Sequence, residues 1–119
     1  MNTARLGEGV AVVRHTGRNG KKGNHAASAS FMTKITSVFS ESGIPWQCGE
    51  LGAVDAGGGS TVSKCIADWG TEVLDIGPAL LSMHSPLEIA SKTDAYWLYR
   101  GIRAFFEDGG PHICHSILY

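Results

Sequence analysis

The sequence predicts an α/β fold in which helices are layered on a mostly parallel or mixed sheet. Short apolar segments that suit strands alternate along the chain with segments whose apolar residues recur at helical spacing. The chain of 119 residues has the length of one ordinary domain, and neither a linker nor an internal repeat divides it. We therefore expect a single domain over residues 1–119 with one hydrophobic core.

The N-terminal half is expected to hold two strands and a long helix. Residues 9–14, GVAVVR, suit a short strand, and residues 44–51, IPWQCGEL, suit a second strand that begins beside a proline. Between them, residues 26–42 carry an apolar helical stripe, and Gly43 stands where a C-cap glycine belongs. The stripe consists of Phe31, Met32, Ile35, Val38 and Phe39.

The C-terminal half continues the alternation. Residues 71–77 and 79–84 are apolar enough for two buried strands, separated by the break at Gly77 and Pro78. A short helix before them would end at Gly70. We expect this helix to bury Val62, Cys65, Ile66 and Trp69.

The last helix is expected over about residues 92–107. Ahead of it, Ser85 fits an N-cap, Pro86 fits a first helical position, and Glu88 completes the spacing of a capping box. The apolar positions of the last helix that we expect to be buried are Ala95, Leu98, Ile102 and Phe105.

Composition excludes several classes of protein. A hydrophobic content of 43%, a charged content of 18% and a net charge of −1 argue against disorder and against a strongly basic nucleic-acid binder. No apolar run is long enough to span a bilayer, and the N-terminal residues do not resemble a signal peptide, so we expect no membrane partner and a cytoplasmic location. Cys48, Cys65 and Cys114 are widely spaced, which favours reduced, structural thiols.

Basic residues are concentrated in residues 14–22, within a stretch from Glu8 to Glu41 that has no acidic residue between its ends. The order Gly-Lys-Lys-Gly does not match a P-loop, which requires Gly-Lys followed by Ser or Thr. A solvated turn is the favoured interpretation. Contact with an anion, a nucleic acid or another subunit is the alternative, although no aromatic residues are interleaved for base stacking.

Two segments are candidates for a functional site. The loop VDAGGGST, with Asp55 at its mouth, leads into a helix, where free backbone N–H groups suit an oxyanion, a phosphate or a carbonyl. His84 follows an apolar segment. An ordinary turn capped by Ser60 or Thr61 and a hydrogen-bonded structural histidine would explain the same residues.

Three blocks, taken in order, resemble the aspartyl aminopeptidase and aminopeptidase I family of zinc aminopeptidases. They are LGEGVAVVRHTGRNGKKGN, IPWQCGELGAVDAGGGSTVSK and VLDIGPALLSMHSPLEIASKTDAYWLYRGIRAFF. The resemblance covers roughly residues 6–107. Residues 108–119 diverge, and their His112, Cys114 and His115 match no standard ligand spacing.

The resemblance implies the C-terminal portion of a zinc-peptidase catalytic domain. In such enzymes two zinc ions polarise the scissile carbonyl and the attacking water, and a glutamate accepts a proton from that water. His84 matches the histidine of the family's MHS block and is therefore the expected metal ligand. The expected substrate-binding residues are Asp55, Gly57, Gly58, Gly59 and Thr61.

The resemblance also implies what this chain does not carry. The family's other metal ligands, its catalytic glutamate and its dimerisation domain match no block here, so we expect a truncated fragment with no catalytic residue that is inactive alone. Smaller departures are His25, Cys48 and Ser60. As partners, the family implies a peptide substrate and a homo-oligomer. The alternative is a non-catalytic α/β module for interaction or assembly.

Overall fold

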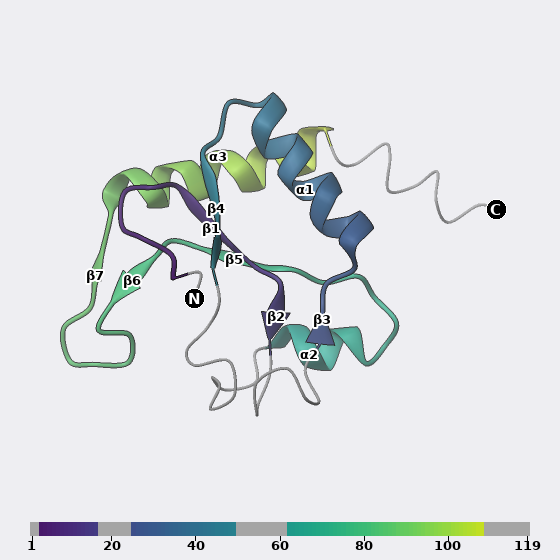
Figure 1. The fold of residues 1–119 in the computed structure, drawn as a ribbon, viewed down its shortest axis with the longest axis horizontal. Coiled ribbons are helices and arrows are strands. Elements are labelled where there is room, and N and C mark those ends of the chain that lie inside the picture. The colour runs from purple at the N-terminus through teal and green to yellow at the C-terminus, as the bar shows by residue number, and fades with distance from the viewer. Residues whose placement is uncertain (1–2, 17–24, 50–61, 109–119) are drawn as a thin grey trace.

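The computed structural model describes residues 3–16, 25–49 and 62–108. A three-stranded sheet is central to the fold, with strand order β4-β1-β5 (Figure 1). The elements are β1 (Val10–Val13), β2 (His15–Thr16), β3 (His25–Ala26), α1 (Ala29–Glu41), β4 (Trp46–Gly49), α2 (Val62–Ala67), β5 (Asp75–Gly77), β6 (Leu80–Leu81), β7 (Ile89–Ala90) and α3 (Lys92–Asp108).

The sheet is mixed, as the sequence predicted. Strand β1 pairs in parallel with β4, with Val10 opposite Trp46, and antiparallel with β5, with Val12 opposite Ile76. The crossover from β1 to β4 includes α1, which is the usual way to return a chain to a parallel neighbour. The predicted strands at 9–14 and 44–51 are therefore confirmed in their described parts.

Helix α1 begins and ends as its sequence indicates. The hydroxyl of Ser28 accepts the N–H of Phe31 at 3.2 Å, which caps the first turn. At the other end Gly43 adopts a φ of 65°, and its N–H donates to the carbonyl of Ser40. The predicted apolar stripe is confirmed, because Ile35 and Phe39 are buried and its other members pack against the core.

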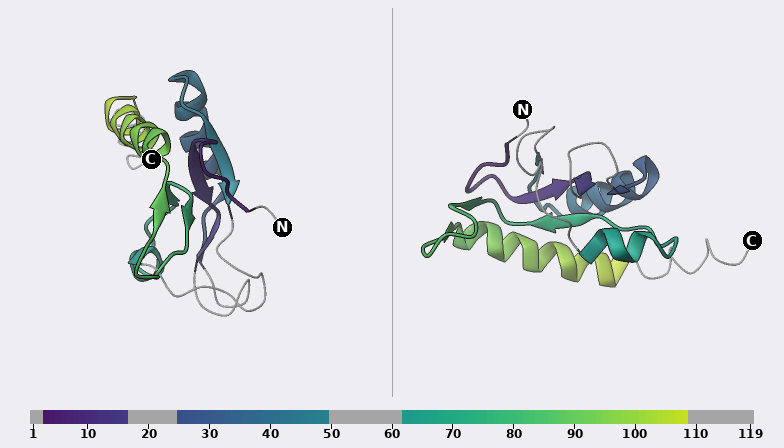
Figure 2. Two further views of the ribbon diagram at one scale, coloured as in Figure 1. Left: turned by 90° about the vertical axis from the view of Figure 1, so that its left-hand side faces the viewer. Right: turned by 90° about the horizontal axis from the view of Figure 1, so that it is seen from below.

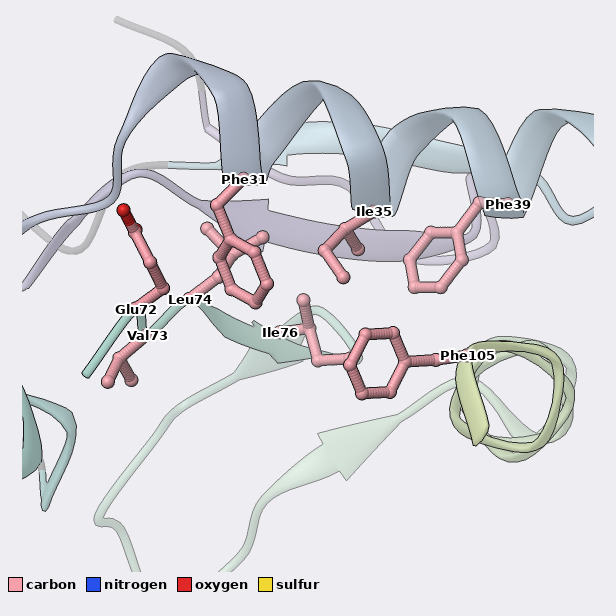
Figure 3. A pocket seen from close by; sticks show the side chains of 8 residues that line it. All are labelled: Phe31, Ile35, Phe39, Glu72, Val73, Leu74, Ile76 and Phe105. Atoms are coloured by element: carbon pink, nitrogen blue, oxygen red, sulfur yellow. The ribbon is translucent and has the colours of Figure 1, made fainter. Parts of the chain in front are cut away.

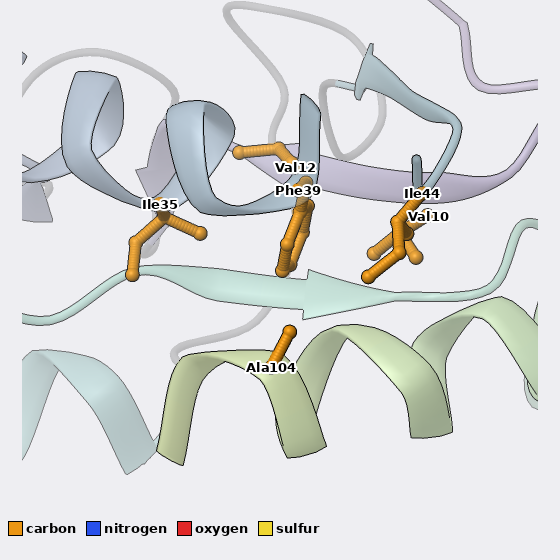
Figure 4. Close-up of a cluster of buried hydrophobic side chains, with 6 residues drawn as sticks. All are labelled: Val10, Val12, Ile35, Phe39, Ile44 and Ala104. Atoms are coloured by element: carbon orange, nitrogen blue, oxygen red, sulfur yellow. The ribbon is translucent and has the colours of Figure 1, made fainter. Parts of the chain in front are cut away.

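The hydrophobic core lies between β1, α1 and α3 (Figure 4). Val10 and Val12 point to one face of their strand, and both helices pack on that face. Figure 2 shows the two helices and the sheet from two further sides. The fully or largely buried side chains of this cluster are Val10, Val12, Ile35, Phe39, Ile44 and Ala104.

The expected inward face of α2 is wrong. Val62 is 74% exposed and Trp69 is 82% exposed, and Cys65 is also exposed. Helix α2 has six residues and lies against β3, outside the hydrophobic core cluster, and of the four residues expected to be buried only Ile66 is half-buried. Gly70 does follow the helix with a φ of 80°, as expected for a terminating glycine.

The segment expected to be a buried strand at 79–84 is also different in the structure. Leu80 and Leu81 form β6, which pairs with β7 in a separate two-stranded hairpin, and Leu81 is 52% exposed. Residues 85–88 form no helical turn. The local spacing of Ser85 and Glu88 imitates a capping box, but the chain instead reverses direction there.

Helix α3 occupies the expected residues but buries a different face. Asp94, Gly101 and Ala104 are buried, whereas Ala95 is exposed and Ile102 is 42% exposed. Position 101 is suited to glycine because α3 approaches α1 closely there. A Cβ atom at this position would stand 2.9 Å from the Phe39 ring. Contact with α1 therefore selects a face that includes a glycine, and on the same helix Asp94 is buried against the backbone of Gly7 and Gly9. Leu98 and Phe105 are half-buried beside this face.

The residue before strand β1 is a glycine, and any other residue at this position would be strained. Gly9 has a φ of 95°, and a Cβ atom there would stand 2.2 Å from the carbonyl oxygen of Pro45. Gly9→Ala is expected to lower the free energy of unfolding by about 2–3 kcal/mol, measured by urea denaturation. Gly7→Ala is the matched control, since Gly7 has a φ of 84° with nothing within 4 Å. Equal losses for the two variants would contradict the steric clash.

Within residues 3–16, 25–49 and 62–108, no helix has both the length and the apolar character needed to cross a lipid bilayer.

Candidate functional site

His84 lies in the loop that connects the strands of the β6–β7 hairpin. The hairpin follows β5 and leads directly into α3, and it projects at one end of the molecule (Figure 1). Its register pairs Leu80 with Ala90 and Leu81 with Ile89. Seven residues, 82–88, therefore form the loop, and His84 stands near its tip.

The loop has an unusual backbone. Ser82 has a φ of 59° and His84 has a φ of 65°, and these are the two non-glycine residues with positive φ in the described chain. Left-handed backbone costs an ordinary residue about 1–2 kcal/mol, and such residues concentrate at functional sites. The outlier falls on the residue that the family resemblance assigns to metal binding.

Three hydrogen bonds hold the loop in this shape. The backbone N–H of His84 donates to Oε1 of Glu88 at 2.6 Å. The N–H of Ser85 donates to the carbonyl of Ser82 at 3.0 Å, and the Ser85 hydroxyl donates to the carbonyl of Leu87 at 2.6 Å. Two of the three bonds thus use side chains of the loop, and a serine and a glutamate that suggested a helix start instead close a turn.

The His84 side chain is exposed, and in the described part of the chain neither of its ring nitrogens is hydrogen-bonded. An exposed imidazole with both nitrogens available suits a metal ligand. In the described part of the chain His84 is not packed as a hydrogen-bonded core histidine, and its role as a metal ligand stays a prediction.

The described residues do not fit a complete zinc site. A catalytic zinc takes three protein ligands and a water, but nowhere in residues 3–16, 25–49 and 62–108 do three His, Cys, Asp or Glu side chains gather. Cys48 and Cys65 are free, as expected for reduced thiols, and both are exposed, on β4 and α2, so neither is packed in the core. His84 fits the role of one ligand only.

The predicted substrate loop lies outside the described residues. Asp55, Gly57, Gly58, Gly59 and Thr61 all belong to residues 50–61, and most of the basic segment at 14–22 falls in residues 17–24. The assignment of these residues to substrate binding therefore stays a prediction.

Two hollows occur elsewhere on the described surface. An apolar groove of about 280 Å³ is lined by side chains of α1, of residues 72–76 and of α3, with Phe31, Ile76 and Phe105 pointing into it (Figure 3). A polar hollow of about 400 Å³ lies over α3 between Arg100, Arg103 and Ser42. Neither includes a residue of the β6–β7 hairpin, so neither is part of the His84 site.

In the polar hollow the charge of Arg103 is already paired with that of Glu107. Nε of Arg103 donates to Oε1 of Glu107 at 2.7 Å, and this hydrogen bond and the charge of Glu107 raise the pKa of the Arg103 guanidinium. Arg100 lies over the ring of Tyr96 at 6.0 Å and donates to its hydroxyl. The cluster is consistent with a solvated helix surface.

One important residue was not identified from the sequence. Asp94 has no exposed surface, and its two carboxylate oxygens accept the N–H groups of Gly7 at 2.7 Å and Gly9 at 3.0 Å. The available signal was the spacing of Ser91 and Asp94, since the Asp94 N–H donates to the Ser91 hydroxyl at the true start of α3. The similar spacing of Ser85 and Glu88 obscured it.

Solved structures with a similar fold include two aminopeptidases. A crystal structure of an M18-family aminopeptidase from Thermotoga maritima has a TM-score of 0.80 and 47% identity over 87% of this chain and 23% of that one. Aminopeptidase I from Clostridium acetobutylicum also has a TM-score of 0.80, with 41% identity over 87% and 23%. A dodecamer named PhTET1-12s, 22% identical over 86% and 27% with a TM-score of 0.66, shares the fold. The fold therefore places the chain in the class of α/β structures found in part of the aminopeptidases.

The sequence comparisons identify the family within this class. A model described as aminopeptidase I zinc metalloprotease (M18) matches residues 1–106, and the chain belongs to this family. A probable M18 family aminopeptidase 1 of Thermotoga maritima is 46% identical over 106 residues, which are 89% of this chain and 24% of the relative. The chain thus spans about a quarter of the length of the curated relatives that it matches.

Proposed function

We propose that this chain contributes one section of the active site of a zinc aminopeptidase that removes N-terminal residues from peptides. His84 supplies one metal ligand, and Asp55, Gly57, Gly58, Gly59 and Thr61 position the substrate. The observation that carries the proposal is the exposed His84 imidazole on a strained turn, within a chain that matches the family from residue 1 to residue 106. Two zinc ions would be held only with ligands from outside this chain.

The chain alone is expected to be inactive. Its described residues offer one candidate ligand where about three are needed, and no catalytic residue of its own is assigned. When bound, the zinc ions would polarise the peptide carbonyl and a water molecule. The contribution that we assign to the chain's own residues is to place one imidazole and one glycine-rich backbone at that site.

A chimera tests the ligand assignment. Residues 1–106 would replace the matching segment of the Thermotoga maritima relative, which restores a full-length chain. His84→Ala in this chimera should lower zinc content and reduce kcat/KM for aminoacyl substrates by more than the about 10–100-fold that is typical of residues supporting a ligand. His15→Ala in the same chimera is the histidine control and should leave zinc content and activity unchanged. Full zinc content and activity in the His84→Ala chimera would reject the assignment.

We further propose that the complete protein forms a homo-oligomer in the cytoplasm. The described surface of α3 supports an assembly role, because Tyr99, Ile102 and Phe106 are 60%, 42% and 73% exposed at spacings of three and four residues. The same observation favours the second candidate function, a non-catalytic interaction module. Sedimentation of the isolated chain separates the two: a stable oligomer without His84-dependent zinc binding would favour the module.

A further inference from the structure

The strained turn at His84 needs a group that holds it, and the structure provides one. The loop of residues 82–88 carries two left-handed residues, Ser82 and His84, neither of which is glycine. Left to itself, such a loop would relax to ordinary backbone angles, because left-handed conformations are disfavoured for residues with a Cβ atom. Relaxation would rotate the Cα–Cβ bond of His84 and redirect its imidazole.

Glu88 opposes this relaxation from a fixed position. It immediately precedes β7, where Ile89 is paired with Leu81 across the hairpin, so its backbone is held by the strand register. From there its carboxylate reaches back four residues and accepts the N–H of His84 at 2.6 Å. A bond this short to an ionised acceptor is of the stronger, charge-assisted kind.

An exposed glutamate on a turn often serves only to keep the surface hydrated. Glu88 differs, because its acceptor atom is directed at the backbone of the candidate ligand and not at solvent. The exposed glutamate Glu107 also contacts the residue four positions earlier, but there it meets the side chain of Arg103 on a regular helix. Glu88 thus acts on a residue whose backbone is strained, whereas Glu107 does not.

We propose that Glu88 is a positioning residue: its carboxylate clamps the His84 N–H, keeps the turn left-handed and so fixes the direction in which the His84 imidazole leaves the hairpin. The purpose of this role, to orient a metal ligand, rests on the proposed function. The contact between Glu88 and His84 does not, because it involves described residues alone. It requires no metal to be present. The imidazole would be preorganised before any ligand arrives.

NMR of the intact 119-residue chain tests the clamp directly. In the unmodified protein the His84 amide should have a high order parameter, about 0.85, and its hydrogen exchange should be slower than that of an unstructured amide. Glu88→Ala removes the acceptor, so the order parameter should fall below about 0.6 and exchange of the His84 amide should accelerate at least about 10-fold. The ring signals of His84 should move toward those of an unstructured histidine.

Three further variants separate positioning from general stability. Glu88→Gln keeps an acceptor oxygen and should retain most of the order, which a role in surface charge alone would not produce. Adding Ser82→Gly to Glu88→Ala should restore part of the order, because glycine tolerates the φ of 59° found there. Glu107→Ala is the matched control and should leave the His84 signals unchanged.

Either of two outcomes would overturn the proposal. If Glu88→Ala leaves the order and exchange of His84 unchanged, the turn does not depend on the clamp. If it unfolds the whole chain, so that α3 signals are lost as well, Glu88 acts on global stability and not on the turn. Failure of the zinc assignment would appear separately, as His84→Ala without effect in the chimera while the clamp behaves as expected.

Discussion

Replacing Asp94 with alanine is expected to lower the free energy of unfolding by about 3–5 kcal/mol. The carboxylate is fully buried and accepts two backbone N–H groups, those of Gly7 and Gly9. Each hydrogen bond to a charged group contributes about 1.5–3 kcal/mol, and alanine would leave both N–H groups without an acceptor. Urea denaturation followed by far-UV circular dichroism measures the loss.

The geometry around Asp94 explains why the effect should be large. Gly7 and Gly9 both have positive φ, which turns their N–H groups toward one point, and Asp94 is placed there by the first turn of α3. The carboxylate also lies at the positive end of the helix dipole. One side chain thus joins the start of β1 to the start of α3.

Asp94→Asn provides the control that keeps the shape. The amide offers one acceptor oxygen and sets its NH₂ group against the other N–H, so one of the two bonds should be lost, at a cost of about 1.5–3 kcal/mol. Hydrogen exchange at Gly7 and Gly9 should accelerate in both variants. A loss below about 1 kcal/mol for the alanine variant would show that water replaces the carboxylate.

Phe39→Ala is expected to be as damaging, at about 3–5 kcal/mol. The ring has no exposed surface and stands in the core between α1, β1 and α3 (Figure 4). Gly101 of α3 leaves room for it, since a Cβ atom at that position would lie 2.9 Å from the ring. Alanine would leave a cavity that Gly101 cannot fill from the α3 side, because glycine has no side chain.

A second phenylalanine of the same protein provides the control for the loss of stability expected from Phe39→Ala. Phe106→Ala removes the same side chain from a position that is 73% exposed, and it should change stability by less than about 0.5 kcal/mol. Phe39→Leu should fall between the two, because it removes less volume. Comparable losses for Phe39→Ala and Phe106→Ala would mean that the core does not lie where the structure places it.

Several elements could be predicted from local sequence because their determinants lie within a few residues of one another. The apolar stripe from Phe31 to Phe39 and the glycine at Gly43 define α1, and both were recognisable without a partner. The valines of β1 define a strand in the same way. The family was recognisable for a related reason, since its motifs are short contiguous blocks.

Predictions that depended on partners were less successful. The inward face of α3 was assigned to its largest apolar residues, yet Asp94, Gly101 and Ala104 are the buried ones. The segment containing His84 was expected to be a buried strand, and it forms an exposed hairpin. In each case the local pattern was compatible with two outcomes. Contacts with distant residues selected the buried face of α3, whereas pairing with the nearby strand β7 formed the hairpin.

The sequence by itself determined the family, the order and type of the main elements, and His84 as the candidate ligand. The tertiary structure alone decided which side of α3 is buried, that Asp94 binds backbone 85 and 87 residues earlier, and that His84 stands on a clamped, left-handed turn. Helix spacing and caps are encoded within one or two turns of chain. The burial of Asp94 depends on residues far apart in the sequence, which only the folded chain brings together. The turn at His84 is held by residues within the same loop, but its backbone angles leave no periodic pattern in the sequence.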